Sequence, residues 1–220
     1  MRKTTPIMIL LSAALLLAAL PATDTFSTGT ALSASWTVQN STWAVGSGIA
    51  RNAVAASEGV ALWNADTFAS NQYAQAAVSG LSTNNNYVGV IARSTGSGAT
   101  IACYVFSTDG ATGSGHTSLG EFTAGSFAEL TGCATTWTAG DVARIEVETS
   151  GANAVLRGYK NGSPVCTYTD TTTVKASGSA GLYAWVSIQA QANGNLDNFE
   201  AGDLGAPPPS TSVRRGFIIK

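Results

Sequence analysis

The chain has 220 residues, 45% of them hydrophobic, which suits one sizeable β domain with terminal segments and leaves little room for a second domain. Only 11% of residues are charged, so the surface must be built largely from Ser, Thr, Asn, Gln and Gly. The chain has 11 Lys and Arg against 13 Asp and Glu, and its cations form no basic block within the domain, so nucleic acid is not an expected partner. The single histidine, His116, excludes a His-rich metal site.

The first 22 residues are typical of an export signal. Arg2 and Lys3 form a positively charged start, an almost unbroken apolar run covers residues 7–20, and Ala22 offers a small residue for cleavage. The run falls short of the roughly 20 residues that span a bilayer, so an uncleaved membrane anchor is the less favoured alternative. We therefore predict a signal peptide over residues 1–22 and a secreted protein, extracellular or at the cell surface, with no membrane segment after cleavage.

Residues 23–204 are expected to form one all-β domain. Short runs of alternating apolar residues are separated by clusters of Gly, Ser, Asn and Asp, and no helical stripe is present. The expected strands, in chain order, are 36–39, 50–54, 60–63, 72–78, 87–93, 100–107, 118–122, 127–130, 142–148, 154–160, 164–169, 181–188 and 196–200. So many strands in one domain indicate two stacked sheets or a barrel.

The clearest local signal is the pair Asn161-Gly162 between two β-prone runs. Both residues tolerate a positive φ, so the pair predicts a two-residue type I′ hairpin. A regular hairpin with this turn places Arg157 opposite Cys166 and Val155 opposite Tyr168.

The composition changes after residue 204. Residues 205–212 form a Pro/Ser/Thr linker, and the end from Arg214 to Lys220 is basic and apolar. The simpler interpretation of residues 205–220 is a disordered tail. The alternative is a strand donated to a neighbouring molecule, or a surface anchor.

Three cysteines, Cys103, Cys133 and Cys166, permit one disulfide bond in an exported protein and leave one thiol. Their separations of 30 and 33 residues match no zinc-binding pattern. Cys103 alternates with apolar neighbours and equally suits a buried free thiol. The sequence leaves the three pairings open.

Alternation along four expected strands separates an inward face from an outward one. The inward set is Val88, Val90, Ala92, Ile101, Cys103, Val105, Ala143, Ile145, Val147, Leu182, Ala184, Val186 and Ile188. The outward set includes Tyr87, Ile91, Arg93, Tyr104, Phe106, Arg144, Glu146, Glu148, Tyr183 and Trp185. If these outward faces belong to one sheet, that sheet carries aromatic rings interleaved with Arg and Glu.

Such a mixture suits carbohydrate, because aromatic rings stack on the apolar faces of pyranoses while Arg and Glu hydrogen-bond to hydroxyls. The expected ligand-binding residues are Arg93, Tyr104, Arg144, Glu146, Arg157, Tyr183 and Trp185. The alternative is that the aromatic residues pack under loops as a second layer of core.

Several turn and strand-end motifs occur in a particular order along the chain. The motifs are Gly89-Val90-Ile91-Ala92-Arg93, a strand holding Tyr104, Gly140-Asp141-Val142, Asn161-Gly162, Gly178 to Leu182, and Asp197-Asn198-Phe199-Glu200. This order resembles the concanavalin A-like jelly rolls, and within them is most similar to laminin-G-like domains of secreted bacterial and phage proteins, over roughly residues 24–201. The resemblance implies a two-sheet antiparallel sandwich whose concave face or rim loops often bind carbohydrate.

Some members of that superfamily are glycoside hydrolases, and Glu146 and Glu148 lie two residues apart on one strand face. A retaining hydrolase needs two carboxyls about 5–5.5 Å apart. The family pattern Glu-x-Asp-x-Glu or Glu-x-Asp-x-x-Glu is incomplete here, because Glu148 takes the middle position and Ser150 or Gly151 the third. We therefore expect no enzyme, and a solvated pair balanced by Arg144 and Arg157.

Calcium is the one cofactor that the sequence leaves open. Asp24 begins the domain and Asp197 lies in its last strand, and the terminal strands of jelly rolls commonly pair. With backbone carbonyls they would suit a structural calcium ion, by analogy with secreted carbohydrate-binding modules. The simpler interpretation is a turn residue and a strand-end cap.

The function predicted from these observations is a secreted, non-catalytic, lectin-like jelly-roll module whose partner is a carbohydrate or polysaccharide. The alternative is a structural or adhesive protein of a cell surface, filament or virion that assembles with other protein subunits, for example through the apolar residues 217–219. A glycoside hydrolase is the third and least favoured function.

Overall fold

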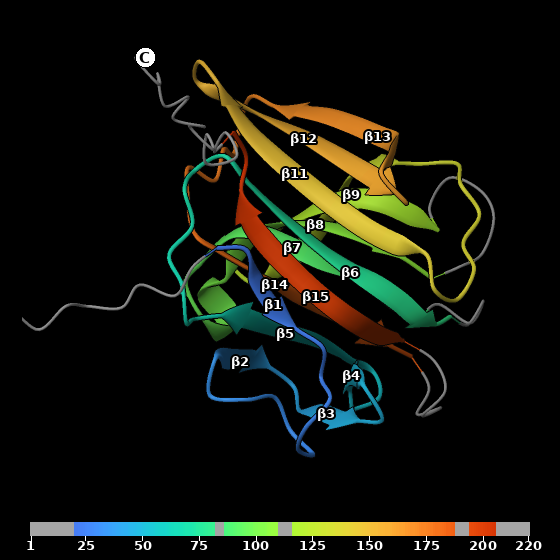
Figure 1. The fold of residues 1–220 in the computed structure, drawn as a ribbon. Coiled ribbons are helices and arrows are strands. Elements are labelled where there is room, and N and C mark those ends of the chain that lie inside the picture. Colours follow the sequence, from blue (N-terminus) through green and yellow to red (C-terminus); the bar gives the residue numbers. More distant parts are fainter. Residues whose placement is uncertain (1–19, 82–85, 110–115, 188–193, 206–220) are drawn as a thin grey trace, which may run out of the picture.

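The computed structural model describes residues 20–81, 86–109, 116–187 and 194–205, which form two antiparallel sheets stacked face to face (Figure 1). Almost all of the expected signal peptide, almost all of the expected tail, and Ile188 lie outside the described residues. In the described part of the chain, no helix has the length and apolar character needed to cross a membrane.

Eight strands make up the first sheet, called sheet A here, in the order β13-β12-β11-β6-β15-β4-β3, with β1 paired to β15. Their bounds are β1 (Ala22–Asp24), β3 (Trp43–Gly46), β4 (Ile49–Asn52), β6 (Gln72–Gly80), β11 (Val142–Ser150), β12 (Asn153–Lys160), β13 (Ser163–Asp170) and β15 (Asn195–Asp203).

Seven strands make up the second sheet, sheet B, in the order β10-β9-β8-β7-β14-β5-β2. Their bounds are β2 (Trp36–Asn40), β5 (Ser57–Trp63), β7 (Tyr87–Thr95), β8 (Ala102–Thr108), β9 (Thr117–Thr123), β10 (Ser126–Gly132) and β14 (Ser179–Val186), and a 3-10 turn (Gly98–Thr100) precedes β8.

This architecture confirms the expected all-β jelly-roll sandwich, with a strand at each of the thirteen expected places. The expectation omitted β1 and β3. β1 has three residues, too few for a period of two to be recognised, and β3 has four.

The main core lies between the two sheets. Alternation placed eight of its members correctly: Val88, Val90 and Ala92 on β7, Ala143, Ile145 and Val147 on β11, and Leu182 and Ala184 on β14. At one end of the sandwich a group of aromatic rings fills the space between the sheets. There the ring of Trp36 contacts those of Trp63 and Phe199, with centroids 5.1 and 4.7 Å away.

Strand β8 corrects the expected assignment of its faces. Tyr104 and Phe106, expected outside, are buried in the core between the sheets, whereas Cys103 and Val105 belong to a second cluster on the outer face. The reason is that β8 is apolar on both faces. Alternation then separates two sets of residues without indicating which one points inward.

The hairpin at Asn161-Gly162 has the expected turn, with φ of 50° and 76° at its two residues. Its register differs from the expectation by one residue, because Arg157 lies opposite Thr167 and Leu156 opposite Tyr168. A bulge between the Tyr159–Pro164 and Gly158–Cys166 pairs accounts for the slip. Pro164 favours a bulge there because it has no N–H for the ladder.

The disulfide bond joins Cys133 to Cys166, whose Cα atoms are 5.5 Å apart. Cys133 follows β10 at the edge of sheet B and Cys166 lies in β13 at the edge of sheet A, so the bond links the two sheets. Cys103 is a free, fully buried thiol, and burial raises its pKa to about 12.

Candidate functional site

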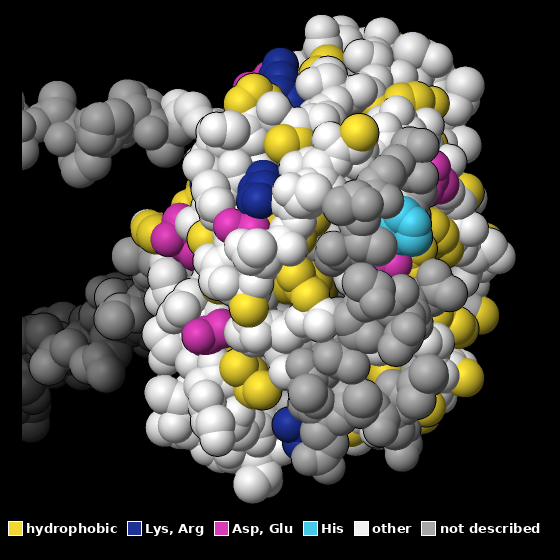
Figure 2. Space-filling model, turned by 90° about the vertical axis from the view of Figure 1, so that its right-hand side faces the viewer, with side chains coloured by type: hydrophobic (Ala, Val, Ile, Leu, Met, Phe, Trp, Pro, Cys, Tyr) yellow, Lys and Arg dark blue, Asp and Glu magenta, His cyan; other side chains and the backbone are white. Residues whose placement is uncertain are grey.

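The outer face of sheet B is apolar, which is unusual for the solvent side of a sandwich. Its buried members are Val60, Leu62, Ile91, Ile101, Cys103, Val105, Phe122 and Tyr183, with Tyr87 and Trp185 packed against them. Phe127 on the edge strand β10 is 37% exposed. In the end-on view of Figure 2, hydrophobic side chains line the right-hand margin, on the side of sheet B.

Strand pairing brings the polar and aromatic residues of this face together. Trp185 of β14 lies opposite Glu58 of β5 on one side and opposite Tyr87 of β7 on the other. Directly paired residues point to the same face of a sheet, so these three side chains share the outer surface. Tyr183 lies two residues before Trp185 on β14, so its side chain points to the same face.

The centre of the face is hollow because small residues occupy the next three strands. Gly89 of β7 pairs with Ser107 of β8, and Ser107 pairs with Ser118 of β9. A Cβ on Gly89 would come 2.0 Å from the carbonyl oxygen of Phe106, so the close approach of β7 and β8 requires glycine there.

A pocket of about 230 Å³ results. Its lining residues are Glu58, Tyr87, Ser107, Ser118, Phe127, Glu129, Tyr183 and Trp185. The two serines form the floor of the pocket. Aromatic side chains border the pocket on two sides, and each side also has one carboxylate. The pocket therefore offers flat apolar surfaces next to hydrogen-bond acceptors.

The aromatic rings of the pocket support one another. Phe127 stacks on Tyr183, with centroids 6.1 Å apart and ring planes 12° apart, and Phe122 contacts both rings edge-on. The Phe127 ring also covers Gly120, where a Cβ would come 2.6 Å from it. These contacts hold the aromatic side chains in place before any ligand arrives.

Burial and negative charge set the electrostatics of the pocket. Burial raises the pKa of the Glu58 carboxyl. Burial, followed by the charges of Asp109 and Glu129, raises the pKa of Tyr87, and burial places the pKa of Tyr183 well above its ordinary value. Both phenols are therefore neutral hydrogen-bonding groups at neutral pH.

No protein-family model and no curated protein matches the sequence. The fold, however, is similar to that of solved structures. The carbohydrate-binding module CBM66 from Bacillus subtilis is 14% identical with a TM-score of 0.52, covering 77% of this chain and 92% of that one. The potassium-bound Emp46p carbohydrate recognition domain is 6% identical with a TM-score of 0.56, covering 77% and 88%.

A third similar structure is the VIP36 exoplasmic/lumenal domain with Ca²⁺ and Man3GlcNAc bound, 12% identical with a TM-score of 0.53, covering 79% of this chain and 86% of that one. The chain shares the two-sheet antiparallel jelly-roll sandwich of these structures. At these identities the likeness establishes the fold alone.

Within this jelly-roll sandwich, the seven expected ligand-binding residues fall in three places. Tyr183 and Trp185 line the pocket on sheet B, whereas Arg144, Glu146 and Arg157 lie on the outer face of sheet A, across the sandwich. The expectation of one shared surface is therefore wrong. Alternation gives the face of each strand but not the sheet to which the strand belongs.

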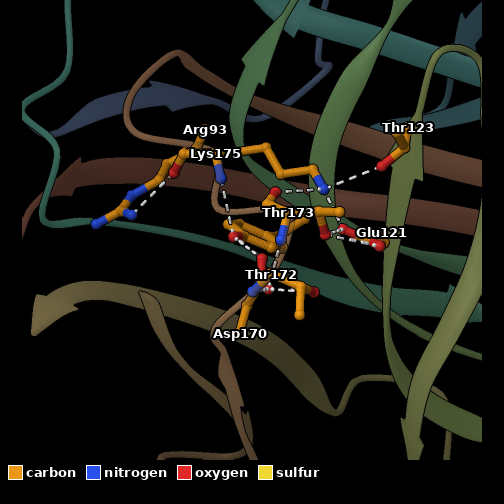
Figure 3. A network of polar contacts seen from close by, with 8 residues as sticks. Arg93, Glu121, Thr123, Asp170, Thr172, Thr173 and Lys175 are labelled. Carbon is orange, nitrogen blue, oxygen red and sulfur yellow. Dashed lines mark hydrogen bonds and ion pairs between the residues drawn. The ribbon is translucent and has the colours of Figure 1, made fainter. Parts of the chain in front are cut away.

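Arg93 and Tyr104 form the third group, a buried polar network at the end of the sandwich (Figure 3). Arg93 donates to the carbonyl oxygens of Ser70 and Lys175, at 2.6 and 2.9 Å, and to the Thr149 hydroxyl at 2.8 Å. It has a φ of 52° at a bulge in the β7–β8 ladder, which removes it from the outward alternation.

Tyr104 is fully buried and hydrogen-bonded in the same network, next to the ion pair of Lys175 and Glu121. Neither Arg93 nor Tyr104 is accessible to a ligand. Their role is structural, which corrects the expectation for both.

The sheet A residues form a ladder of bonded charges. Arg144 donates to Glu146 at 2.9 Å and places its guanidinium 3.7 Å from the centroid of the Tyr73 ring. Arg157 pairs with Glu148 at 2.6 Å. Glu146 and Glu148 are thus each paired with an arginine on the same face of sheet A.

The carboxylates of Asp24 and Asp197 accept hydrogen bonds from other groups of the protein. Strands β1 and β15 pair as expected. The Asp24 carboxylate accepts from the Phe26 N–H and from Trp36 Nε1, both at 2.8 Å, and Asp197 accepts from the Asn198 N–H at 2.6 Å. In the part of the chain that the structure describes, no group of three or more His, Cys, Asp or Glu side chains could hold a metal ion.

Glu58, Phe127 and Glu129 also line the pocket and were not among the residues expected there. Phe127 and Glu129 alternate on one face of β10, and Glu58 alternates with Val60 and Leu62 on β5. Alternation identifies which face of a strand a side chain is on. Whether three strands border one pocket, as β5, β14 and β10 do, depends on the order of the strands in the sheet.

Proposed function

We propose that this chain is a secreted, non-catalytic carbohydrate-binding module, laminin-G-like within the concanavalin A-like jelly rolls, whose ligand lies in the sheet B pocket. The observation that carries the proposal is the pocket itself. Four aromatic side chains from β7, β10 and β14 and two carboxylates surround it on one face of the sandwich. A hollow of about 230 Å³ suits a short stretch of glycan.

The chemistry of the lining supports a sugar. Trp185 and Tyr87 are half-buried neighbours, so each presents part of its aromatic surface to solvent for stacking on C–H groups. Glu58 and Glu129 supply acceptors for hydroxyl groups, and hydrogen bonds to an ionised acceptor are stronger than neutral ones.

The solved neighbours are consistent with this proposal. Their titles name a carbohydrate-binding module, a carbohydrate recognition domain and a domain with a bound mannose glycan. They share the sandwich with this chain, and the proposal extends their ligand class to it on the strength of the pocket.

The test is binding of the full chain and its Trp185→Ala variant to a broad glycan and polysaccharide array, followed by titration of the best ligand. We expect Trp185→Ala to weaken binding by about 10- to 50-fold, the effect of removing a central aromatic anchor. The matched control is Tyr159→Ala, an aromatic residue on the outer face of sheet A, which should bind like the wild type. Circular dichroism and thermal unfolding check that both variants fold.

The outcomes separate the alternatives. Loss of binding in Tyr159→Ala and not in Trp185→Ala would move the site to the sheet A face with Arg144, Glu146 and Arg157. A blank array from folded protein would favour assembly through protein contacts. The array is run with calcium and with EDTA, and calcium dependence would make Asp24 and Asp197 the ligands to test.

A further inference from the structure

The two carboxylates of the pocket differ from the other glutamates. Four of the six glutamates in the described ranges have a hydrogen-bond or ion-pair partner: Glu121, Glu146, Glu148 and Glu200. Glu58 and Glu129 have no partner among the residues that the structure describes, and both line the pocket.

The cations of the protein lie elsewhere. None of the six Lys and Arg residues in the described ranges lines the pocket. Arg93 and Lys175 belong to the buried network, and Arg144, Arg157 and Lys160 pair with carboxylates of sheet A or its connecting loop. In Figure 2 the visible Lys and Arg side chains lie away from the hydrophobic margin on the side of sheet B.

Other charges near the pocket are consistent with its negative character. The charges of Asp109 and Glu129 both raise the pKa of Tyr87, and His116 contacts Asp109 at 2.9 Å. Ionised Glu58 is partly removed from water, and burial raises its pKa. A ligand cation would restore the electrostatic stabilisation that this carboxylate loses on burial, and the attraction is stronger there than in bulk water.

Aromatic rings add a second attraction for the same kind of ligand. A cation held over the face of Trp or Tyr gains cation–π stabilisation, which grows when the site is desolvated. Trp185 lies directly opposite Glu58, so an ammonium group could meet a ring and a carboxylate together.

We infer that the pocket selects sugars with a free ammonium group, such as the glucosamine units of a deacetylated glycan, and rejects acidic sugars. This inference rests on the proposed function and names its ligand class. The same sugar ring stacks whether or not its nitrogen is acetylated, so the two unpaired carboxylates and not the aromatic rings determine the choice.

The test compares three oligosaccharides of equal length, built from glucosamine, N-acetylglucosamine and galacturonate, by calorimetric titration against the full chain. We expect glucosamine oligomers to bind at least tenfold more tightly than the acetylated ones, with no measurable galacturonate binding. The preference should shrink several-fold in Glu58→Gln and in Glu129→Gln. The matched control is Glu148→Gln, a carboxylate on the opposite sheet, which should leave the preference unchanged.

Each other outcome has a clear meaning. Equal binding of acetylated and free amino sugars, lost in Trp185→Ala, would overturn the charge selection and keep the proposed function. Binding of no carbohydrate on the wider array would overturn both. A preference that Glu148→Gln reduces as much as Glu58→Gln would show a general effect of net charge and contradict a role for the pocket carboxylates.

Discussion

At the scale of single residues, the buried hydroxyl of Tyr104 connects Asp170 to Lys175, two of the residues labelled in Figure 3. It donates to the Asp170 carboxylate at 2.6 Å and accepts from the Lys175 backbone N–H at 3.0 Å. Burial and then the bond to Asp170 raise its pKa, so it stays protonated and able to donate. The hydroxyl thereby satisfies two buried polar groups, one at the end of β13 and one in the segment that follows it.

We predict that Tyr104→Phe lowers the free energy of unfolding by about 1–3 kcal/mol, because the Lys175 N–H and one Asp170 oxygen lose their partner. Urea denaturation at neutral pH measures the change. Tyr168→Phe is the matched control, since Tyr168 packs against the core and makes no hydrogen bond with its hydroxyl among the described residues. An equal loss in both variants would show that the network adds no stability of its own.

At the scale of elements, Asp141 fixes the start of β11 to its surroundings. Its carboxylate accepts from the Thr138 N–H at 2.7 Å and from Asn161 Nδ2 at 2.6 Å, and pairs with Lys160 at 2.9 Å. The β10–β11 connection and the β12–β13 hairpin are thus held together by one side chain.

These contacts predict a dependence of stability on pH. Burial raises the pKa of Asp141, but the bonds from Lys160, Thr138 and Asn161 outweigh it and bring the pKa down to about 2. The folded pKa is below the unfolded value of about 3.9, so the stabilisation is present above that value and is lost as the pH falls toward 2.

Asp141→Asn should therefore lower the free energy of unfolding by about 1–2 kcal/mol at pH 7, and this difference from wild type should become smaller at pH 2.5. Urea titrations at the two pH values measure it. Glu148→Gln removes a largely exposed ion pair and should cost less at both. A difference that stays constant with pH would contradict the role given to the ionised carboxylate.

At the scale of the whole molecule, the disulfide closes one open side of the sandwich. Strands β10 and β13 are the edge strands of sheets B and A, and the Cys133–Cys166 bond connects the segment after one to the middle of the other. It limits the freedom of the unfolded chain over 33 residues. A loop of that length corresponds to about 3–4 kcal/mol in the chain-entropy description.

The double variant Cys133→Ala/Cys166→Ala should lose about that much stability in urea denaturation. In the wild type, a thiol reagent should label nothing at pH 8, because Cys103 is buried with a pKa of about 12, and should label one cysteine after unfolding. Rapid labelling of the native protein would contradict the burial of Cys103, and a peptide map with Cys103 in the bridge would contradict the observed pairing.

Sequence patterns predicted much of the fold. Alternation identified the strands, and Asn161-Gly162 identified its turn, because both depend on neighbouring residues. The register after that turn was wrong, since the bulge before Cys166 depends on how β13 meets β12 and closes the disulfide. Of the expected site, Tyr183 and Trp185 were placed on the pocket face, and Arg93 and Tyr104 were misplaced.

An all-β sandwich with an apolar interior and few charges follows from composition and a period of two, because both are local properties. Which faces meet follows from the assembled fold. Trp185 and Glu58 are far apart in the chain but lie opposite each other, and Arg144 lies across the sandwich from both. Strand order follows from packing over the whole domain, so the pocket appears only once the two sheets are assembled.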